Sequence, residues 1–218
     1  LTSFYWDNLI FFGSGPKLAA DGKLDFVLPM GQAKLPGIAA EDIGRCAYGV
    51  FQRGDTLIGK TVGIAGEHLS GAEMAAALGR ALGKEVRHND VSPEAYRDFG
   101  FPGADDLGNM FQFKRDFERE FRAARDPAFA RRLNPALQSF DAWLKVLRIN
   151  LAAAMALTRS TLPLLTVAPD ASVIFTLDTR GEDPRAYWGA YATAKAGLSA
   201  LVATLADEWE SRSNLRVN

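Results

Sequence analysis

The stretch Tyr191-Ala192-Thr193-Ala194-Lys195 lies within a long helical pattern in the last third of the chain. Residues four apart on a helix share one face, so the Tyr191 phenol and the Lys195 ammonium can approach each other. A cation beside a phenol favours the phenolate and lowers the pKa of the phenol toward neutral pH. Such a phenol can transfer protons in alcohol or ketone chemistry. The spacing alone also fits a solvated helix face, so the surrounding segments decide the interpretation.

The surrounding segments alternate between helices and strands. A helical pattern runs from Lys145 to Leu165, and the β-branched run from Ser172 to Leu177 predicts a buried strand of the parallel type. The loop 180–184 leads to a second long helix predicted over 186–210, and Leu215 to Asn218 begin another strand. This order is typical of an α/β fold.

Residues 145–218 resemble the central part of the short-chain dehydrogenase/reductase family. The shared features are the helix with Ile149-Asn150-Leu151, the strand, the helix with Tyr191 and Lys195, and a final Leu-Arg-Val-Asn, in the family's order and spacing. The resemblance implies that Tyr191 is the general acid/base and that Asn150 supports a proton-relay water. It also implies that Lys195 holds the nicotinamide ribose and lowers the tyrosine pKa. NAD or NADP, contacted by Tyr191 and Lys195, and a small-molecule carbonyl substrate are therefore expected.

One position departs from that family's pattern. Thirteen residues before the tyrosine, where the family has a serine that donates a hydrogen bond to the substrate, this chain has Asp178. An ionised carboxylate cannot donate a hydrogen bond, and it would raise the pKa of Tyr191. Catalysis survives if desolvation keeps Asp178 protonated, or if Thr176 on the same strand face replaces the serine. Alternatively, Asp178 only caps a turn with Thr179 and Gly181.

The first two-thirds of the chain also mixes helices and strands. Ser70-Gly71-Ala72-Glu73 is a capping box, so the strand and helix on either side of it form one βα unit of an α/β sheet. Strands are expected at 24–29, 61–66 and 84–88, helices at 38–52, 71–83, from Ser92 to Gly100 and over 105–121, and a buried helix or strand at 1–12.

Residues 1–144 resemble the C-terminal half of the NmrA-like family, atypical relatives of the short-chain dehydrogenases. The resemblance implies kinship with NADP-binding redox sensors, many of which act as regulatory partners rather than catalysts. These proteins bind NADP through a glycine-rich loop in their N-terminal half, which this sequence does not contain, so no residue of 1–144 is assigned to a cofactor. The matching stretches are Phe4–Leu9, Ala39–Gly44, Val62–Gly66, Ser92–Tyr96, Gly100–Ala104, Asn109–Phe111, Arg132–Pro135 and Phe140–Leu144.

The expected fold is α/β: a partial, doubly wound Rossmann-type sheet with long helices that lacks the N-terminal glycine-rich βαβ unit. Gly13-Ser14-Gly15-Pro16 lacks the third glycine of a phosphate-binding loop, and no clear strand and helix surround it. We expect two domains, an NmrA-like one over 1–144 and a short-chain dehydrogenase-like segment over 145–218. The chain therefore resembles pieces of two related proteins joined near Trp143.

Composition excludes several classes of protein. With a net charge of -1 and 48% hydrophobic residues, nothing favours nucleic acid or a membrane surface as a partner. No apolar run approaches the roughly 18 residues of a membrane span. Basic side chains between Lys114 and Arg132 alternate with acids and predict a solvated face. The single Cys46, expected to be buried and inert, fits a reducing, cytoplasmic compartment, and with His68 and His88 it predicts no metal site.

Three functions remain open at this point. The first is an NAD(P)-linked oxidoreductase with Tyr191 as acid/base in carbonyl or alcohol hydride chemistry. The second is a non-catalytic NmrA-like module for NADP sensing or regulation, acting on a protein partner, and the third is an inactive truncated chimera. The missing phosphate loop and Asp178 both favour the second over the first. We also expect a homo-oligomer, because the two long helices would expose apolar faces.

Overall fold

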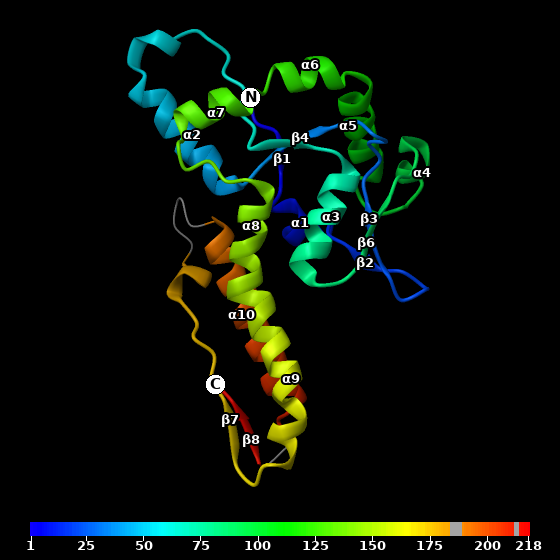
Figure 1. Cartoon of the computed structure of the whole chain (residues 1–218), viewed down its shortest axis with the longest axis vertical. Helices are drawn as coiled ribbons and strands as arrows, with labels where there is room; N and C mark the ends of the chain where they lie inside the picture. Colours follow the sequence, from blue (N-terminus) through cyan, green and yellow to red (C-terminus); the bar gives the residue numbers. More distant parts are fainter. Residues whose placement is uncertain (184–188, 212–213) are drawn as a thin grey trace. The chain divides into compact units, whose positions relative to one another are not determined.

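The computed structural model describes residues 1–183, 189–211 and 214–218, which divide into two compact units, Leu1–Trp143 and Leu144–Asn218. Short strands alternate with helices in both units, which confirms the expected α/β class (Figure 1). The elements of the first unit are β1 (Phe4–Tyr5), α1 (Asn8–Phe11), β2 (Lys17–Leu18), β3 (Leu24–Val27), β4 (Leu35–Ile38), α2 (Ala40–Gln52), η1 (Gly54–Leu57), β5 (Glu67–Leu69), α3 (Gly71–Leu82), β6 (Val86–Asn89), α4 (Pro93–Arg97), α5 (Ala104–Asp116), α6 (Glu118–Ala123), α7 (Pro127–Leu133) and the start of α8 (Phe140–Leu147). The second unit continues with η2 (Arg148–Ala152), α9 (Ala153–Val167), β7 (Ala171–Val173), η3 (Thr179–Gly181), α10 (Gly189–Glu208) and β8 (Leu215–Val217).

Two small mixed sheets carry the strands of the first unit. In one, β4 pairs in parallel with β1 and antiparallel with β5. In the other, β3 pairs in parallel with β6 and antiparallel with β2. The parallel pair β3–β6 aligns Leu24 with Val86, so the strands predicted around these two residues are confirmed.

The capping box predicted at the start of α3 is present. The Ser70 hydroxyl accepts a hydrogen bond from the Glu73 amide, and the Glu73 carboxylate accepts one from the Ser70 amide. The helix ends at Gly83, whose φ of 65° lies in the left-handed region that glycine adopts without strain. Local sequence chemistry therefore fixes both ends of α3.

The strand predicted over 61–66 is wrong. The backbone there forms two separate contacts: the Ile64 amide donates to the Leu1 carbonyl and the Gly66 amide to the Gly37 carbonyl. Gly63 lies against the Ala124 carbonyl, where a Cβ would come within 1.7 Å of the oxygen. The apolar run thus packs tightly without forming a ladder, and the strand β5 begins only at Glu67.

A fully buried carboxylate, Asp42, joins α2 to the segment between α7 and α8. Asp42 lies in the first turn of α2. Its carboxylate accepts hydrogen bonds from the Asn134 side-chain amide at 2.8 Å and from the Gln138 backbone amide at 2.9 Å. Desolvation raises the pKa of Asp42 above its usual value. Cys46, one turn later on α2, is also fully buried, which confirms the predicted burial. Burial raises the pKa of its thiol to about 11, which favours the predicted inert cysteine.

The helix predicted over 105–121 is interrupted at Phe117, whose φ of -111° and ψ of 34° separate α5 from α6. The solvated basic face predicted for this region is present at Arg119, whose side chain is 91% exposed. The prediction of a solvated side chain is wrong for Lys114, which is only 8% exposed.

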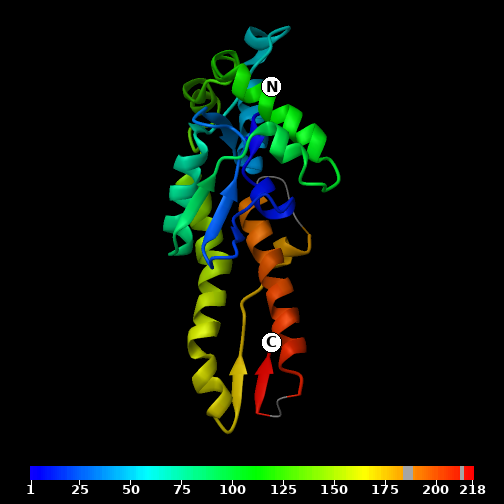
Figure 2. The ribbon, with the colours of Figure 1, turned by 90° about the vertical axis from the view of Figure 1, so that its right-hand side faces the viewer.

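In the second unit, α8, η2 and α9 follow one another without an intervening loop, as the long helical pattern predicts. Asn150 lies in η2, a π-helical turn of a kind often found at functional sites. Figures 1 and 2 show α9 and α10 running along one face of the parallel pair β7–β8. Ala171, Trp209 and Leu215 form the buried centre of this packing.

The buried strand predicted over 172–177 is only partly correct. β7 covers Ala171–Val173, and Ile174 is 78% exposed. Among the described residues β7 pairs with β8 alone, so no second neighbour extends the ladder or covers Ile174. Of the helix predicted over 186–210, positions 189–208 are helical, while 186–188 lie outside the described residues, as does residue 184 of the preceding loop.

None of the helices in the described ranges combines the length and the apolarity that crossing a membrane requires.

Candidate functional site

The four residues that the sequence singles out all lie in the second unit. Tyr191 and Lys195 lie on α10, Asn150 lies in η2, and Asp178 directly precedes η3. The Lys195 ammonium lies 5.6 Å from the centroid of the Tyr191 ring, so the helix places the two on one face as predicted.

Asp178 holds the Tyr191 phenol. The Tyr191 hydroxyl donates a hydrogen bond of 2.9 Å to Asp178 Oδ2, while Asp178 Oδ1 accepts the Arg180 amide at 2.8 Å and caps η3. The Arg180 amide, and then the Tyr191 hydroxyl, lower the pKa of Asp178. Asp178 is therefore ionised at neutral pH, and the possibility of a desolvated, protonated carboxyl at this position is wrong.

The same hydrogen bond raises the pKa of Tyr191 above its ordinary value, with smaller contributions from burial and from the negative charge of Asp178. The lysine was expected to have the opposite effect on the tyrosine. Its ammonium donates to the Thr176 carbonyl oxygen at 2.9 Å instead. Lys195, which is 8% exposed, thus connects α10 to the segment after β7 through this hydrogen bond.

A groove of about 460 Å³ lies beside Lys195. Its polar lining includes Asn150 and Lys195, together with hydroxyl side chains of Thr158, Thr161, Ser172 and Thr176. Asn150 also donates to the Val146 carbonyl at 3.0 Å. Most of the remaining wall is apolar, with Ile149, Leu157, Val173, Phe175 and Leu198. Tyr191 and Asp178 are not among the described residues that line this groove, so the structure groups Lys195 with Asn150 and leaves the phenol apart.

At two turns where a strand leads into a helix, the described residues do not fit the pyrophosphate of a dinucleotide. At the turn from β4 to α2, the Ala40 amide donates to the Asp7 carboxylate at 2.7 Å. At the turn from β5 to α3, the Glu73 carboxylate occupies the equivalent place. A free helix N-terminus is what binds phosphate, and here the chain's own acids fill it. Gly13-Ser14-Gly15 lies between α1 and the short β2, which is not a phosphate-loop context.

No cluster of three or more His, Cys, Asp or Glu side chains suited to a metal ion occurs in the part of the chain that the structure describes.

Sequence reasoning missed one residue with functional character. Lys114 lines a separate pocket in the first unit. The signal was its spacing from Phe111 and Phe121, three residues before and seven after, which places it on the apolar face of the helical pattern.

Two family models match the sequence. Residues 1–144 match the NmrA-like family, and residues 131–218 match the short chain dehydrogenases. The uncharacterized oxidoreductase YciK of Escherichia coli (strain K12) is 40% identical over 81 residues, which are 37% of this chain and 31% of that protein.

Solved structures with a similar fold include NmrA, a negative transcriptional regulator, at 20% identity and a TM-score of 0.50. They also include the Citrobacter sp. triphenylmethane reductase complexed with NADP(H), at 18% identity and a TM-score of 0.53. Each alignment covers 66% of this chain, and 49% and 50% of the two proteins respectively. The chain thus spans about half of these structures and about a third of the curated relative.

Proposed function

The chain belongs to the NmrA-like family, whose model it matches over residues 1–144 of its 218, and on this premise we propose that it is a non-catalytic regulatory module. The two sequence families and the oxidoreductase relative support, at a coarse level, either an NAD(P)-linked oxidoreductase or an NmrA-like regulator. The residues around Tyr191 favour the regulator.

One observation carries this choice: the hydrogen bond from the Tyr191 hydroxyl to Asp178. A general acid must hand its proton to the substrate and recover it near neutral pH. Here the bond retains the proton on the phenol and raises the pKa of Tyr191. Each pKa unit makes deprotonation of the phenol about tenfold less favourable. An ionised Asp178 also opposes the negative charge that develops on a substrate oxygen.

The oxidoreductase is the second candidate, and the groove beside Lys195 favours it. Asn150 and Lys195 both line this mainly apolar concavity, the usual form of a small-molecule site. The two strand-to-helix turns that the chain's own acids fill count against it, because a nicotinamide dinucleotide needs its pyrophosphate anchored. A small-molecule or protein partner, a cytoplasmic location and a homo-oligomer remain part of the proposal.

The test compares the wild type with Tyr191→Phe in NADPH oxidation against a panel of ketones, alongside a fluorescence titration of NADPH. We expect equal background rates in both proteins, because the phenol proton is not available. Binding of NADPH without oxidation would fit a sensor, and no binding at millimolar cofactor would fit a cofactor-independent regulator. A rate in the wild type that disappears in Tyr191→Phe would establish the oxidoreductase instead.

A matched variant, Asp178→Ser, restores a neutral donor at this position. Its Tyr191 pKa, followed by NMR of ring-labelled tyrosine with Tyr191→Phe to assign the signal, should fall relative to the wild type. An unchanged pKa would remove the physical basis of the proposal.

A further inference from the structure

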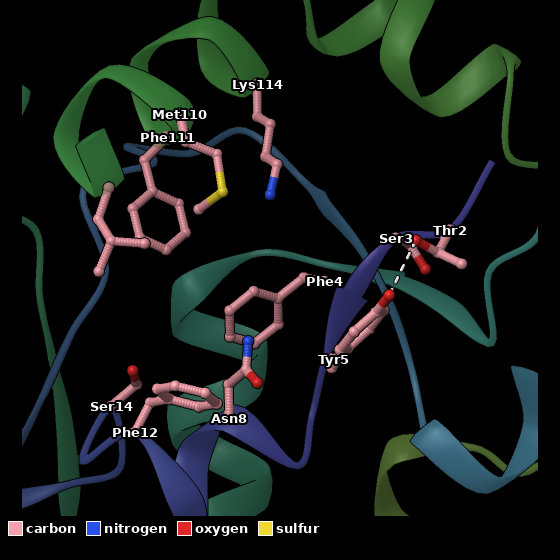
Figure 3. Close-up of a pocket in the computed structure, with 11 residues that line it drawn as sticks. Thr2, Ser3, Phe4, Tyr5, Asn8, Phe12, Ser14, Met110, Phe111 and Lys114 are labelled. Carbon is pink, nitrogen blue, oxygen red and sulfur yellow. Dashed lines mark hydrogen bonds between the residues drawn. The ribbon is translucent and has the colours of Figure 1, made fainter. Parts of the chain in front are cut away.

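A second concavity, of about 410 Å³, lies in the first unit between α5 and the N-terminal segment. Figure 3 shows its lining, with Lys114 extending from α5 toward the space beside Met110, Phe4 and Ser3. The wall is mostly apolar and aromatic, with Phe4, Tyr5, Phe12, Leu107, Met110 and Phe111. A hydrophobic pocket with a few polar groups is the usual form of a small-molecule site.

The charge in this pocket has no counter-ion. Lys114 is 8% exposed, and within the described ranges no ion pair or hydrogen bond engages its ammonium. Its Nζ lies 5.6 Å from the ring centroids of Phe111 and Phe121 and 6.0 Å from that of Phe4. The nearby charged side chain is Arg125, which has the same sign and lies on the Phe121 ring. Aromatic rings offset only part of the cost of burying a cation, so an anion is the missing partner.

A second polar group in the same wall is also unsatisfied. The Ser3 hydroxyl is buried, with the residue 9% exposed, and it has no hydrogen-bond partner in the described part of the chain. By contrast, the neighbouring Thr2 and Tyr5 hydroxyls already bond to each other at 3.2 Å (Figure 3). Native proteins rarely bury a hydroxyl unpaired, so Ser3 and Lys114 together indicate an absent ligand with acceptor oxygens.

We propose that this pocket binds a small monocarboxylic acid with an apolar, aromatic body, whose carboxylate pairs with Lys114 and can accept a hydrogen bond from Ser3. One ammonium matches one negative charge, whereas a phosphate dianion needs more donors than these. The aromatic wall buries the ligand's apolar body, and the volume suits a bicyclic ring system. This ligand site does not depend on whether the second unit is catalytic.

The test uses isothermal titration calorimetry on the full chain with 2-naphthoate and its neutral isostere 2-naphthamide. Lys114→Met keeps the length of the side chain without its charge, Ser3→Ala removes the hydroxyl, and Lys60→Met removes an exposed lysine as a control. We expect 2-naphthoate to bind the wild type at least about tenfold more tightly than 2-naphthamide, because a buried charge-assisted hydrogen bond is lost with the amide. Lys114→Met should remove that preference, Ser3→Ala should reduce it, and Lys60→Met should leave it unchanged.

Inorganic phosphate and NADPH serve as competing anions in the same experiment. Equal affinity for 2-naphthoate and 2-naphthamide, or no binding of 2-naphthoate at millimolar concentration, would overturn the proposal. Phosphate or NADPH binding that Lys114→Met abolishes would also overturn it, since the anion would then be a phosphate. Circular dichroism of Lys114→Met and Lys60→Met establishes that both variants fold.

Discussion

The carboxylate of Asp178 accepts one hydrogen bond from a backbone amide and one from a phenol, and these two contacts set the chemistry of Tyr191. The neighbouring lysine contributes little to the chemistry of Tyr191, because the Lys195 ammonium donates its hydrogen bond to the Thr176 carbonyl. A tyrosine and a lysine four residues apart are therefore not sufficient for a reactive phenol. The acceptor opposite the hydroxyl decides whether its proton is released or retained.

Lys114 supports a prediction about pH at the same scale. Burial, with a smaller effect of the Arg125 charge, lowers the pKa of Lys114 to about 8. In the unfolded chain the pKa of a lysine is about 10.4, so between these values the unfolded state holds more protons than the folded state. The free energy of unfolding must then rise with pH in this window, because the folded state gains stability as Lys114 loses its proton.

We therefore expect Lys114→Met to be more stable than the wild type at pH 7, by up to about 3 kcal/mol. The difference should shrink as the pH rises from 8 toward about 10. Urea unfolding at several pH values measures this difference, and Lys60→Met, which replaces an exposed lysine, is the control. A constant difference across the window would mean that Lys114 titrates as an exposed lysine.

At the scale of elements, the sequence predicts best where one local rule dominates. α3 has a capping box at Ser70 and a left-handed glycine at its end, and both are found. The strand predicted over 61–66 is wrong because a strand needs a neighbouring strand to pair with, and there Gly63 packs against the Ala124 carbonyl instead. The break between α5 and α6 at Phe117 is a change in one residue's backbone angles, and the helical periodicity of the sequence does not report it.

The candidate site divides in the same way. Helical spacing correctly put Tyr191 and Lys195 on one face, and the identity of Asp178 correctly indicated that the pKa of the phenol would rise. The sequence could not tell that the lysine would bond to a main-chain carbonyl, because main-chain acceptors carry no sequence signature. Lys114 was predicted on the solvated face because of its charge, although its spacing from Phe111 and Phe121 indicated the apolar face, where the structure places it.

Asp42 offers an element-scale prediction, since it connects α2 to the segment between α7 and α8. Replacing it with alanine leaves the Asn134 amide and the Gln138 backbone N–H buried without acceptors. We expect Asp42→Ala to lower the free energy of unfolding by about 2 kcal/mol, the cost of unpaired buried donors reduced by the removal of a desolvated charge. Chemical denaturation measures the loss.

Asp55→Ala is the matched control, because Asp55 is exposed in η1. Its change should stay within about 0.5 kcal/mol. Equal stability of Asp42→Ala and the wild type would show that the buried carboxylate only balances its own desolvation.

At the scale of the whole molecule, the second unit exposes large apolar side chains that a globular protein usually covers. Leu157, Leu164 and Val167 on α9 are 66%, 70% and 79% exposed, and their spacing of seven and three residues places them on one side of the helix. Contiguous apolar surface of this kind tends to bind another chain. We infer that copies of the chain associate through this side of α9.

The prediction is that light scattering at increasing protein concentration gives a mass above that of the 23.7 kDa monomer. The double variant Leu157→Glu/Leu164→Glu should return the mass to the monomer value, because association would then bury uncompensated charges. Met155→Glu is the control, since Met155 is equally apolar and 57% exposed but faces the opposite side of α9. A wild type that stays monomeric at high concentration would contradict the inference. Dissociation by Met155→Glu alone would place the interface on the other side of the helix.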